Sequence, residues 1–233
     1  MQINGSIALV TGANRGIGHR YVEQLLAQGA QKVYAGARRP ELVDVTDPRV
    51  VALHLDLLDQ DSITQAARTA SDVTVLVNNA GITTGATLLT SPVADIRADL
   101  ETHLFGTLGV IRAFTPVLLA NGPSAVVNVL SVLSWVATAA GSGSYSVAKA
   151  AQWNMTNGVR VELAGQGVLV QGVHLGAADT DMMAGNDGPK IDPAEVARAS
   201  LAGLEAGAIE VLVDDAARFV KAALAGDPAH LYG

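Results

Sequence analysis

The sequence predicts one α/β domain over residues 1–233, a mostly parallel, doubly wound sheet with helices on both faces. The first observation is that short apolar runs alternate with helix-length segments along the whole chain. The second is composition: with 233 residues, 49% of them hydrophobic and 16% charged, the chain can bury one large core without a second domain. Strand, helix and strand repeated in this way favour parallel pairing.

The expected elements follow one another from the N-terminus. Buried strands are expected where an apolar run is bounded by Gly, Asn, Asp or Pro, at residues 7–10, 32–35, 50–55, 73–77, 125–130 and 168–174. Helices are expected between them, at residues 16–28, 61–70, 95–120 and 145–164. A strand at 210–213 and a helix at 214–225 complete the chain. Residues 180–193 contain Gly and Met without a clear period, which is typical of a mobile loop or a short helix over a site.

Charge and cysteine content exclude several classes of partner and site. The net charge of -7 and the lack of a basic run argue against nucleic acid and anionic membranes as partners. The chain has no cysteine, so neither a disulfide framework nor a thiolate site can form. No His, Asp and Glu cluster has metal-site spacing, and we expect no metal. The apolar run at the N-terminus is too short for a secretory or spanning segment, which favours a cytoplasmic protein.

The stretch TGANRGIG, Thr11 to Gly18, ends the first expected strand and opens the first expected helix. Glycines permit a sharp turn there and let a pyrophosphate approach the backbone, while the helix N-terminus offers free N–H groups and a positive dipole end. Gly12, Gly16 and Gly18 follow the spacing T-G-x-x-x-G-x-G rather than G-x-G-x-x-G. A tight turn alone would explain the glycines, but the strand-to-helix context favours a dinucleotide site.

The second expected strand, KVYAGARRP, indicates which dinucleotide. An NAD site usually ends this strand with an acidic residue that binds the ribose 2'-hydroxyl. Here Ala37 is followed by Arg38 and Arg39, and Arg15 in the glycine turn is expected to reach the same place. Arginine offers a permanent charge and paired donors for a 2'-phosphate, so NADP (NADPH) is favoured and NAD is the alternative, in which the two arginines form a solvated turn. Asp56 is placed to meet the adenine or to cap a helix.

Four motifs occur in order along nearly the whole chain. They are TGANRGIG, NNAG at Asn78 to Gly81, a serine at the end of the fifth expected strand, and YSVAK at Tyr145 to Lys149. In order and approximate spacing they resemble the classical short-chain dehydrogenase/reductase family. The resemblance implies a Rossmann-type fold and oxidoreductase activity. The cofactor-binding residues that it implies, together with the charged groups above, are Gly12, Asn14, Arg15, Gly16, Ile17, Gly18, Arg38, Asp56, Asn79, Ala80, Gly81, Tyr145, Lys149 and Thr180.

The resemblance makes Tyr145 the catalytic acid/base and gives Lys149 a place at the nicotinamide ribose. In a helix, residues four apart lie on one face, one turn from each other. A free tyrosine has a pKa of about 10, which is too high for efficient proton exchange near neutral pH. A lysine cation about 4 Å away, at an effective dielectric constant of about 20, would lower this pKa by at most roughly 3 units. The alternative is a tyrosine and a lysine on a solvated helix.

Two catalytic positions depart from the family pattern. The carbonyl-binding serine falls at Ser131, but the spacing from it to Tyr145 is one residue longer than usual, so Ser134 is the alternative. Relatives commonly have asparagine, part of a proton relay, where this chain has His103. We expect His103 either to join the relay, through its carbonyl or its imidazole, or merely to pack. Two further histidines, His54 and His174, lie in expected strands and are interpreted as core residues.

Together these residues predict an NADPH-dependent reductase or dehydrogenase that interconverts a ketone or aldehyde and an alcohol by hydride transfer. The alternatives are a non-catalytic NADP-binding sensor or scaffold and an NAD-linked alcohol dehydrogenase. The resemblance also implies a homodimer or homotetramer packed through the helices at 95–120 and 145–164. Residues that flank the expected chemistry would suit a hydrophobic substrate or belong to the core: Thr83, Val132, Leu133, Trp135, Met182 and Met183.

Overall fold

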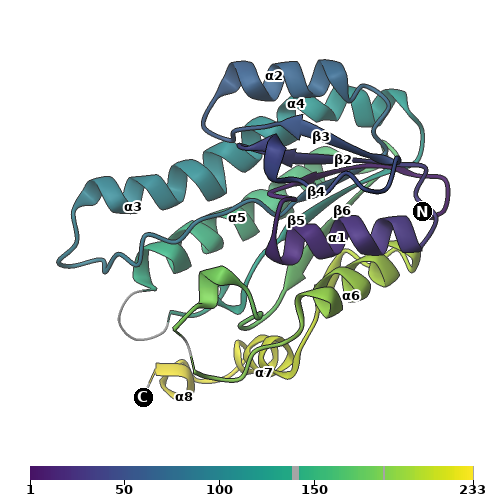
Figure 1. Ribbon diagram of the computed structural model, residues 1–233. Coiled ribbons are helices and arrows are strands. Elements are labelled where there is room, and N and C mark those ends of the chain that lie inside the picture. Colours follow the sequence, from purple (N-terminus) through teal and green to yellow (C-terminus); the bar gives the residue numbers. More distant parts are fainter. Residues whose placement is uncertain (138–141, 186, 233) are drawn as a thin grey trace.

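The computed structural model describes residues 1–137, 142–185 and 187–232, and its centre is a seven-stranded sheet (Figure 1). Every pairing between neighbouring strands is parallel, as the sequence predicts. The sheet order is β3-β2-β1-β4-β5-β6-β7. The strands are β1 (Ile7–Thr11), β2 (Lys32–Ala37), β3 (Val50–His54), β4 (Val75–Asn78), β5 (Ser124–Val129), β6 (Val168–His174) and β7 (Glu210–Leu212).

Helices cover both faces of the sheet, which confirms the predicted doubly wound α/β class (Figure 1). On one face, α1 (Gly16–Ala27) and α6 (Pro193–Glu205) share a core with the inner side chains of β1 and β2. On the other face, α2 (Gln60–Thr69), α4 (Thr107–Ala120) and α5 (Gly143–Glu162) pack around Phe114. The remaining elements are α3 (Val93–Leu100), α7 (Asp215–Ala223), α8 (Ala229–Tyr232) and the 3₁₀ turns η1 (Pro40–Leu42), η3 (Val132–Ser134) and η4 (Asp181–Met183).

The strand order reverses between β1 and β4. From β1 the sheet grows outward through β2 to β3, and β4 then pairs with the other side of β1. The connections that follow β1 and β4 therefore leave in opposite directions, and a crevice opens outside the carboxyl ends of these strands. Open α/β sheets bind their ligands at this switch point, so the fold itself indicates where to look for a site.

The expected helix at 95–120 is one helical stretch with an irregular middle. α3 leads into the π-helical turn η2 (Glu101–Gly106), and α4 follows directly. A π turn holds one extra residue, which apolar periodicity does not reveal, and such turns often occur at functional sites. By length and apolar composition alone Val93–Ala120 could cross a membrane, but residues of α4 such as Val110 and Phe114 belong to the core of the sheet.

Two smaller features of the fold differ from expectation, and a third agrees. The helix α6 was not expected, although Asp192 caps it and Pro193 occupies its first turn. The segment 180–193, expected as a mobile loop or a short helix, contains the short helix η4 and leads into α6. His54 is not a core histidine, because β3 is an edge strand and the side chain is exposed, in contact with Ser62 Oγ. His174 is fully buried, as expected.

Candidate active site

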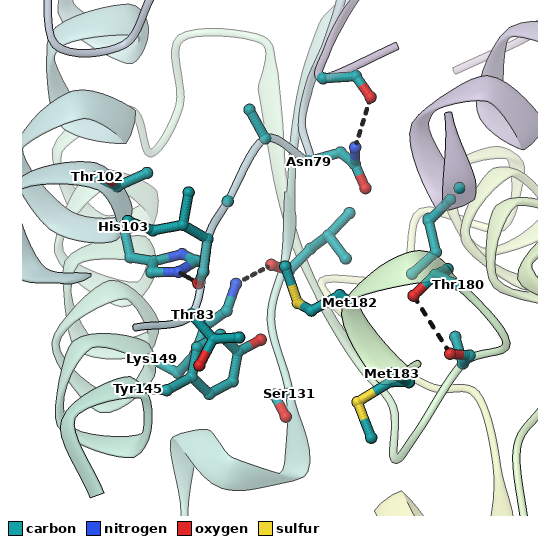
Figure 2. A pocket seen from close by; sticks show the side chains of 18 of the residues that line it. Asn79, Thr83, Thr102, His103, Ser131, Tyr145, Lys149, Thr180, Met182 and Met183 are labelled. Atoms are coloured by element: carbon teal, nitrogen blue, oxygen red, sulfur yellow. Dashed lines mark hydrogen bonds between the residues drawn. The ribbon is translucent and has the colours of Figure 1, made fainter. Parts of the chain in front are cut away.

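A cavity of about 810 Å³ opens outside the carboxyl ends of the strands, at the switch point (Figure 2). This volume is within the range of small-molecule sites, roughly 300–1,000 Å³. With the exception of Gly18, every catalytic and cofactor-binding residue predicted from the sequence lines the cavity. Gly18 lies beneath the lining, where a Cβ would overlap the Gly12 carbonyl oxygen and come within 2.6 Å of Asn79 Nδ2. Backbone packing therefore requires glycine at position 18.

The glycine turn is tied to the end of β4 by hydrogen bonds. Thr11 Oγ1 accepts from the backbone N–H groups of Asn79 and Ala80, both at 3.0 Å. Asn79 Nδ2 donates in return to Thr11 O at 3.0 Å. Gly12 has a φ of 65°, and a Cβ there would lie 2.9 Å from Ala80 Cα. Two backbones thus meet in a space that a side chain would fill, which explains both the glycine and the NNAG motif.

The N-terminus of α1 faces the same cavity and fits an anionic group. Gly16, its first residue, lines the cavity with a φ of 54°. Arg15 at the N-cap makes no side-chain capping bond, and the first turn contains no acidic residue. The N–H groups of this turn are therefore available to a phosphate, which the positive end of the helix dipole also favours. The turn satisfies the geometric requirements of a dinucleotide pyrophosphate site.

The charged residues expected at the adenosine end also line the cavity, with one correction. Arg15 and Arg38 both belong to the lining. Arg15 Nη1 forms an exposed ion pair with Asp181 Oδ2 of η4 at 2.8 Å. Asp56 lines the cavity as well, but it is not the cap of a helix: Asp59 caps α2, and Asp56 Oδ1 accepts from Leu58 N at 3.0 Å. Arg39 does not line the cavity. With Arg15 and Arg38 in the lining and no carboxylate at the end of β2, this part of the cavity suits a phosphate better than a hydroxyl.

Tyr145, Lys149 and Ser131 meet on one wall of the cavity, with Met182 and Met183 on the opposite wall (Figure 2). Lys149 Nζ lies 5.6 Å from the centre of the Tyr145 ring. Burial lowers the pKa of Lys149 to about 7. Burial also raises the pKa of Tyr145 above its usual value, Asp99 raises it further, and a hydrogen bond with Ser131 lowers it. The expectation that the protein lowers this pKa was therefore wrong for the free protein, because removal of the phenol from water dominates the shift.

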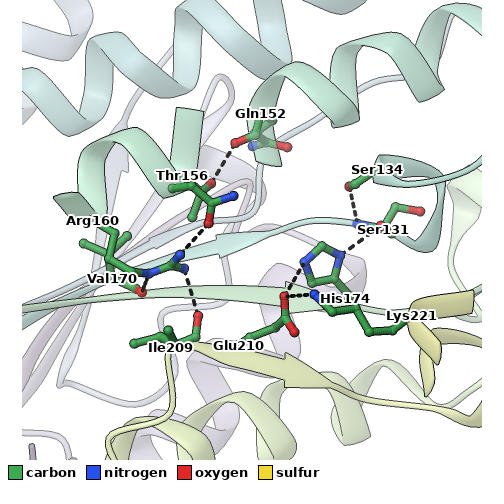
Figure 3. A network of polar contacts seen from close by, with 11 residues as sticks. Ser131, Ser134, Gln152, Thr156, Arg160, Val170, His174, Ile209, Glu210 and Lys221 are labelled. Atoms are coloured by element: carbon green, nitrogen blue, oxygen red, sulfur yellow. Dashed lines mark hydrogen bonds and ion pairs between the residues drawn. The ribbon is translucent and has the colours of Figure 1, made fainter. Parts of the chain in front are cut away.

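Ser131 is held at three of its atoms (Figure 3). Its N–H donates to Ser134 Oγ at 3.3 Å, and its hydroxyl oxygen accepts from Leu133 N at 3.1 Å. Its carbonyl oxygen lies 3.1 Å from His174 Nδ1, which must carry the proton because a carbonyl only accepts. Ser131 lines the cavity and Ser134 does not. Ser134 thus supports the backbone of the serine that reaches the ligand space.

His174 belongs to a larger cluster behind this wall (Figure 3). The ring of Trp135 stacks on His174, with centroids 3.7 Å apart and planes inclined by 16°. The ammonium of Lys221 lies over the Trp135 ring, 4.8 Å from its centroid, and forms an ion pair with Glu210 at 2.9 Å. Trp135 does not line the cavity, so of its two interpretations, pocket residue or core residue, the structure favours the second. Thr83, Val132, Leu133, Met182 and Met183 do line it.

The π-helical turn η2 places His103 beside Tyr145. The two rings meet edge to face, with centroids 5.2 Å apart. His103 Nε2 lies 2.7 Å from Ile82 O and must therefore be the protonated nitrogen. Burial, reinforced by the charge of Lys149, lowers the pKa of His103 to about 3, so the ring is neutral near pH 7. Its Nδ1 is a buried acceptor with no partner among the described residues.

Two buried polar residues at this wall escaped the sequence analysis. Gln152 accepts a hydrogen bond from Lys149 Nζ at 2.9 Å, a contact that the three-residue spacing on one helix could have indicated. The carboxylate of Asp99 accepts two hydrogen bonds from Thr84, one from its backbone N–H at 3.1 Å and one from its hydroxyl at 2.9 Å. No local pattern points to Asp99, because its contact with Thr84 depends on how α3 packs on the loop after β4.

Comparisons with known proteins agree with this geometry. A family model described as short chain dehydrogenase matches residues 6–189. A 3-oxoacyl-[acyl-carrier-protein] reductase of Synechocystis sp. is 31% identical over 191 residues, 77% of each chain. An uncharacterized oxidoreductase of Staphylococcus saprophyticus is 27% identical over 219 residues, 88% of this chain and 93% of its own.

Solved structures extend the similarity to the whole fold. A short chain dehydrogenase from Burkholderia cenocepacia in complex with NADP is 43% identical, with a TM-score of 0.94 over 100% of this chain and 98% of its own. A short-chain dehydrogenase from Streptomyces avermitilis is 29% identical, with a TM-score of 0.85 over 98% and 96% of the two chains. A match over this much of the sequence, on so similar a fold, places the protein in the short-chain dehydrogenase/reductase family of oxidoreductases.

Proposed function

We propose that the protein is an NADPH-dependent reductase that converts a ketone or an aldehyde into an alcohol, and catalyses the reverse reaction. The observation that carries the proposal is the meeting of Ser131, Tyr145 and Lys149 on one wall of the cavity that also contains the glycine turn. Bound NADPH would supply the hydride in this site. The glycine turn, Arg15, Arg38 and Asn79 would hold the dinucleotide, with Lys149 and Thr180 at its nicotinamide end.

The chain's own residues provide the polar steps. Ser131 donates a hydrogen bond to the substrate oxygen, where negative charge develops in the transition state. Its hydroxyl oxygen accepts from Leu133 N, so the O–H, which hydrogen-bonds with Tyr145 in the free protein, would donate to the substrate oxygen when substrate binds. Tyr145 gives its phenolic proton to the same oxygen and takes one back in the oxidation. Lys149 stabilises the phenolate that this proton transfer leaves behind.

The preference for NADPH over NADH has two supports. Arg15 and Arg38 line the cavity, and β2 ends in Ala37 rather than an acidic residue. The related Burkholderia cenocepacia protein, at 43% identity, was solved with NADP. Structures at 21% and 19% identity contain NADH and NAD, respectively, but at that distance they share only the fold. An NAD-linked alcohol dehydrogenase is therefore the less favoured reading.

The substrate side of the cavity favours an apolar carbonyl compound. Val132 and Leu133, which follow Ser131 in the chain, line the cavity, and so do Met182 and Met183 of η4. Methionine side chains adapt to ligands of irregular shape. We propose a hydrophobic ketone or aldehyde as the substrate class.

A non-catalytic NADP-binding protein is the second candidate. The raised pKa of Tyr145 and the neutral His103 favour it, because neither group exchanges protons readily near pH 7 in the free protein. Both candidates need the glycine turn, but only the reductase needs the phenol of Tyr145.

Substitution of Tyr145 distinguishes the reductase from the non-catalytic NADP-binding protein. NADPH consumption, with NADH in parallel, should be measured against a panel of hydrophobic aldehydes and ketones, for the wild type and for Tyr145→Phe. We expect turnover with NADPH that falls by at least about 100-fold in the variant, since general acid catalysis contributes about 100- to 10,000-fold. NADPH affinity, measured by fluorescence titration, should stay within about threefold of wild type. Tight NADPH binding without turnover on any compound would favour the sensor instead.

A further inference from the structure

The ammonium group of Lys149 is held between two neutral oxygen atoms. Its Nζ donates to Val129 O at the end of β5 and to Gln152 Oε1, each at 2.9 Å. An ammonium has three donors, so among the described residues one N–H is left for the cavity. Lys149 is only 4% exposed, and neither of its acceptors carries a charge.

The amide of Gln152 has only one orientation that satisfies its neighbours. Lys149 can only donate, so the oxygen of the amide must face it. Gln152 Nε2 then donates at 3.2 Å to Oγ1 of Thr107, which is the first residue of α4. Gln152 and Thr107 are each 1% exposed. A buried chain of hydrogen bonds therefore runs from α4 through α5 to the ammonium.

Among the residues that the structure describes, no group that faces Lys149 cancels its charge. Tyr145 on α5, His103 in η2 and His174 on β6 are neutral near pH 7, because burial raises the pKa of the phenol and lowers the pKa values of both imidazoles. Asp99 on α3 is already bonded to Thr84, and its charge acts on Tyr145. Buried ammonium groups usually pair with a carboxylate, and this one does not.

We propose that Gln152 is a positioning residue for the catalytic lysine: its neutral amide oxygen holds the Lys149 ammonium in place without cancelling the positive charge that Tyr145 requires. This inference rests on the proposed function for its consequence in catalysis. A carboxylate at position 152 would hold the ammonium but cancel its charge. An apolar side chain would not cancel the charge, but it would no longer hold the ammonium in place. It would also no longer favour the charged ammonium over the neutral amine.

The two substitutions move the pKa of Lys149 in opposite directions. The pKa is read by NMR titration of lysine side chains labelled with carbon-13, in the free protein without substrate. The chain has only Lys32, Lys149, Lys190 and Lys221, and the signal that is lost in Lys149→Arg identifies the one of interest. We expect Gln152→Glu to raise the pKa of Lys149 by about 1 to 3 units and Gln152→Met to lower it by about 1 unit.

The matched control is Gln166→Glu, which makes the same change of charge at an exposed residue just beyond α5. It should leave the pKa of Lys149 unchanged. If Gln152→Glu does not fold, Thr107→Val removes the anchor of the glutamine without touching the lysine, and it should lower the pKa in the same direction as Gln152→Met. Equal pKa values in wild type, Gln152→Met and Thr107→Val, or shifts of the same sign in both Gln152 variants, would overturn the proposal.

The pH dependence of turnover supplies a second readout. Lys149 is charged below its pKa and neutral above it, so the activity that Gln152→Met loses at neutral pH should return as the pH is lowered. Gln152→Glu should lose at least about tenfold in kcat at every pH, because its ammonium stays charged but is paired. If the lysine titrates as expected and the wild type reduces no carbonyl compound, the proposed function fails while the effect on the lysine stands. If the wild type turns over and the lysine does not respond to Gln152, this inference alone fails.

Discussion

His103 and His174 are each held in one neutral form by a backbone carbonyl. His103 donates from Nε2 to Ile82, and His174 donates from Nδ1 to Ser131. Burial lowers their pKa values to about 3 and about 4, so both rings are uncharged throughout the neutral range. Neither ring gains or loses charge in that range. The His103 ring can therefore donate and accept hydrogen bonds near pH 7, but it does not pick up a proton to become an imidazolium.

We predict that His174 acts on catalysis through Ser131. His174→Leu removes the donor to the Ser131 carbonyl and should lower kcat/KM for the carbonyl substrate by about tenfold, the effect of about one hydrogen bond. His174→Asn keeps an N–H donor at a similar reach and should recover most of this loss. NADPH affinity should stay constant in both variants, because His174 does not line the cavity. A fall in NADPH affinity as large as the fall in kcat/KM would show that the residue merely supports the fold.

Single residues could be predicted from sequence where a motif names them. The glycine turn, Tyr145 and Lys149 fall in the cavity as the pattern indicates. Trp135 could not be placed in this way, because its contacts depend on which way one side chain points from a known element. Trp135 follows Ser131 closely in the chain, yet it stacks on His174 behind the cavity wall.

At the scale of elements, the N-terminus of α1 is linked to η4 across the mouth of the cavity. The ion pair of Arg15 with Asp181 is one link, and a Cβ on Gly16 would lie 3.2 Å from Thr180. Both members of the ion pair are exposed, with 67% and 73% of the side chain accessible. Such a pair is worth only about 0.2–1 kcal/mol, so a phosphate can compete for the arginine.

We predict that Asp181 tunes the choice between NADPH and NADH. Asp181→Asn frees Arg15 and removes a negative charge near the expected 2'-phosphate. NADPH should then bind about two- to fivefold more tightly, and NADH should bind as before. Titration of both dinucleotides by fluorescence measures the two affinities, and the gain should shrink at high salt because the groups are exposed. An equal gain for NADH would mean that η4 moves for reasons unrelated to the arginine.

Element type was predictable where periodicity is strong, and element shape was not. The six longer strands and the helices α1, α2, α4 and α5 lie close to where apolar patterns predict them. The π turn at Glu101–Gly106 changes the period by one residue inside a helix that is apolar on several sides, so no pattern marks it. α6 has clear start signals in Asp192 and Pro193, and it was missed because the segment before it shows no period.

At the scale of the whole molecule, the parallel sheet follows from the alternation of strands and helices alone. The location of the site also follows, since the strand order reverses beside β1 and ligands bind where it does. The walls of the cavity required the structure, because β5, the loop after β6, α5 and η4 contribute to them from distant parts of the chain. No local signal specifies how such segments meet.

At the outer surface of α5 we predict a contact between subunits of a homodimer or homotetramer. Val147, Gly158 and Val161 are exposed along this helix, with 75% of Val161 accessible. A glycine between two valines would let a second helix approach closely and bury them, and closed symmetric assemblies are the common outcome for such a self-complementary face. Sedimentation velocity at micromolar concentration should show an assembly for the wild type and monomer for Val161→Asp. Val45→Asp, at another exposed valine in the loop after η1, is the control and should assemble normally. A wild type that sediments only as monomer would contradict the prediction, whereas normal assembly of Val161→Asp would place the contact elsewhere than on α5.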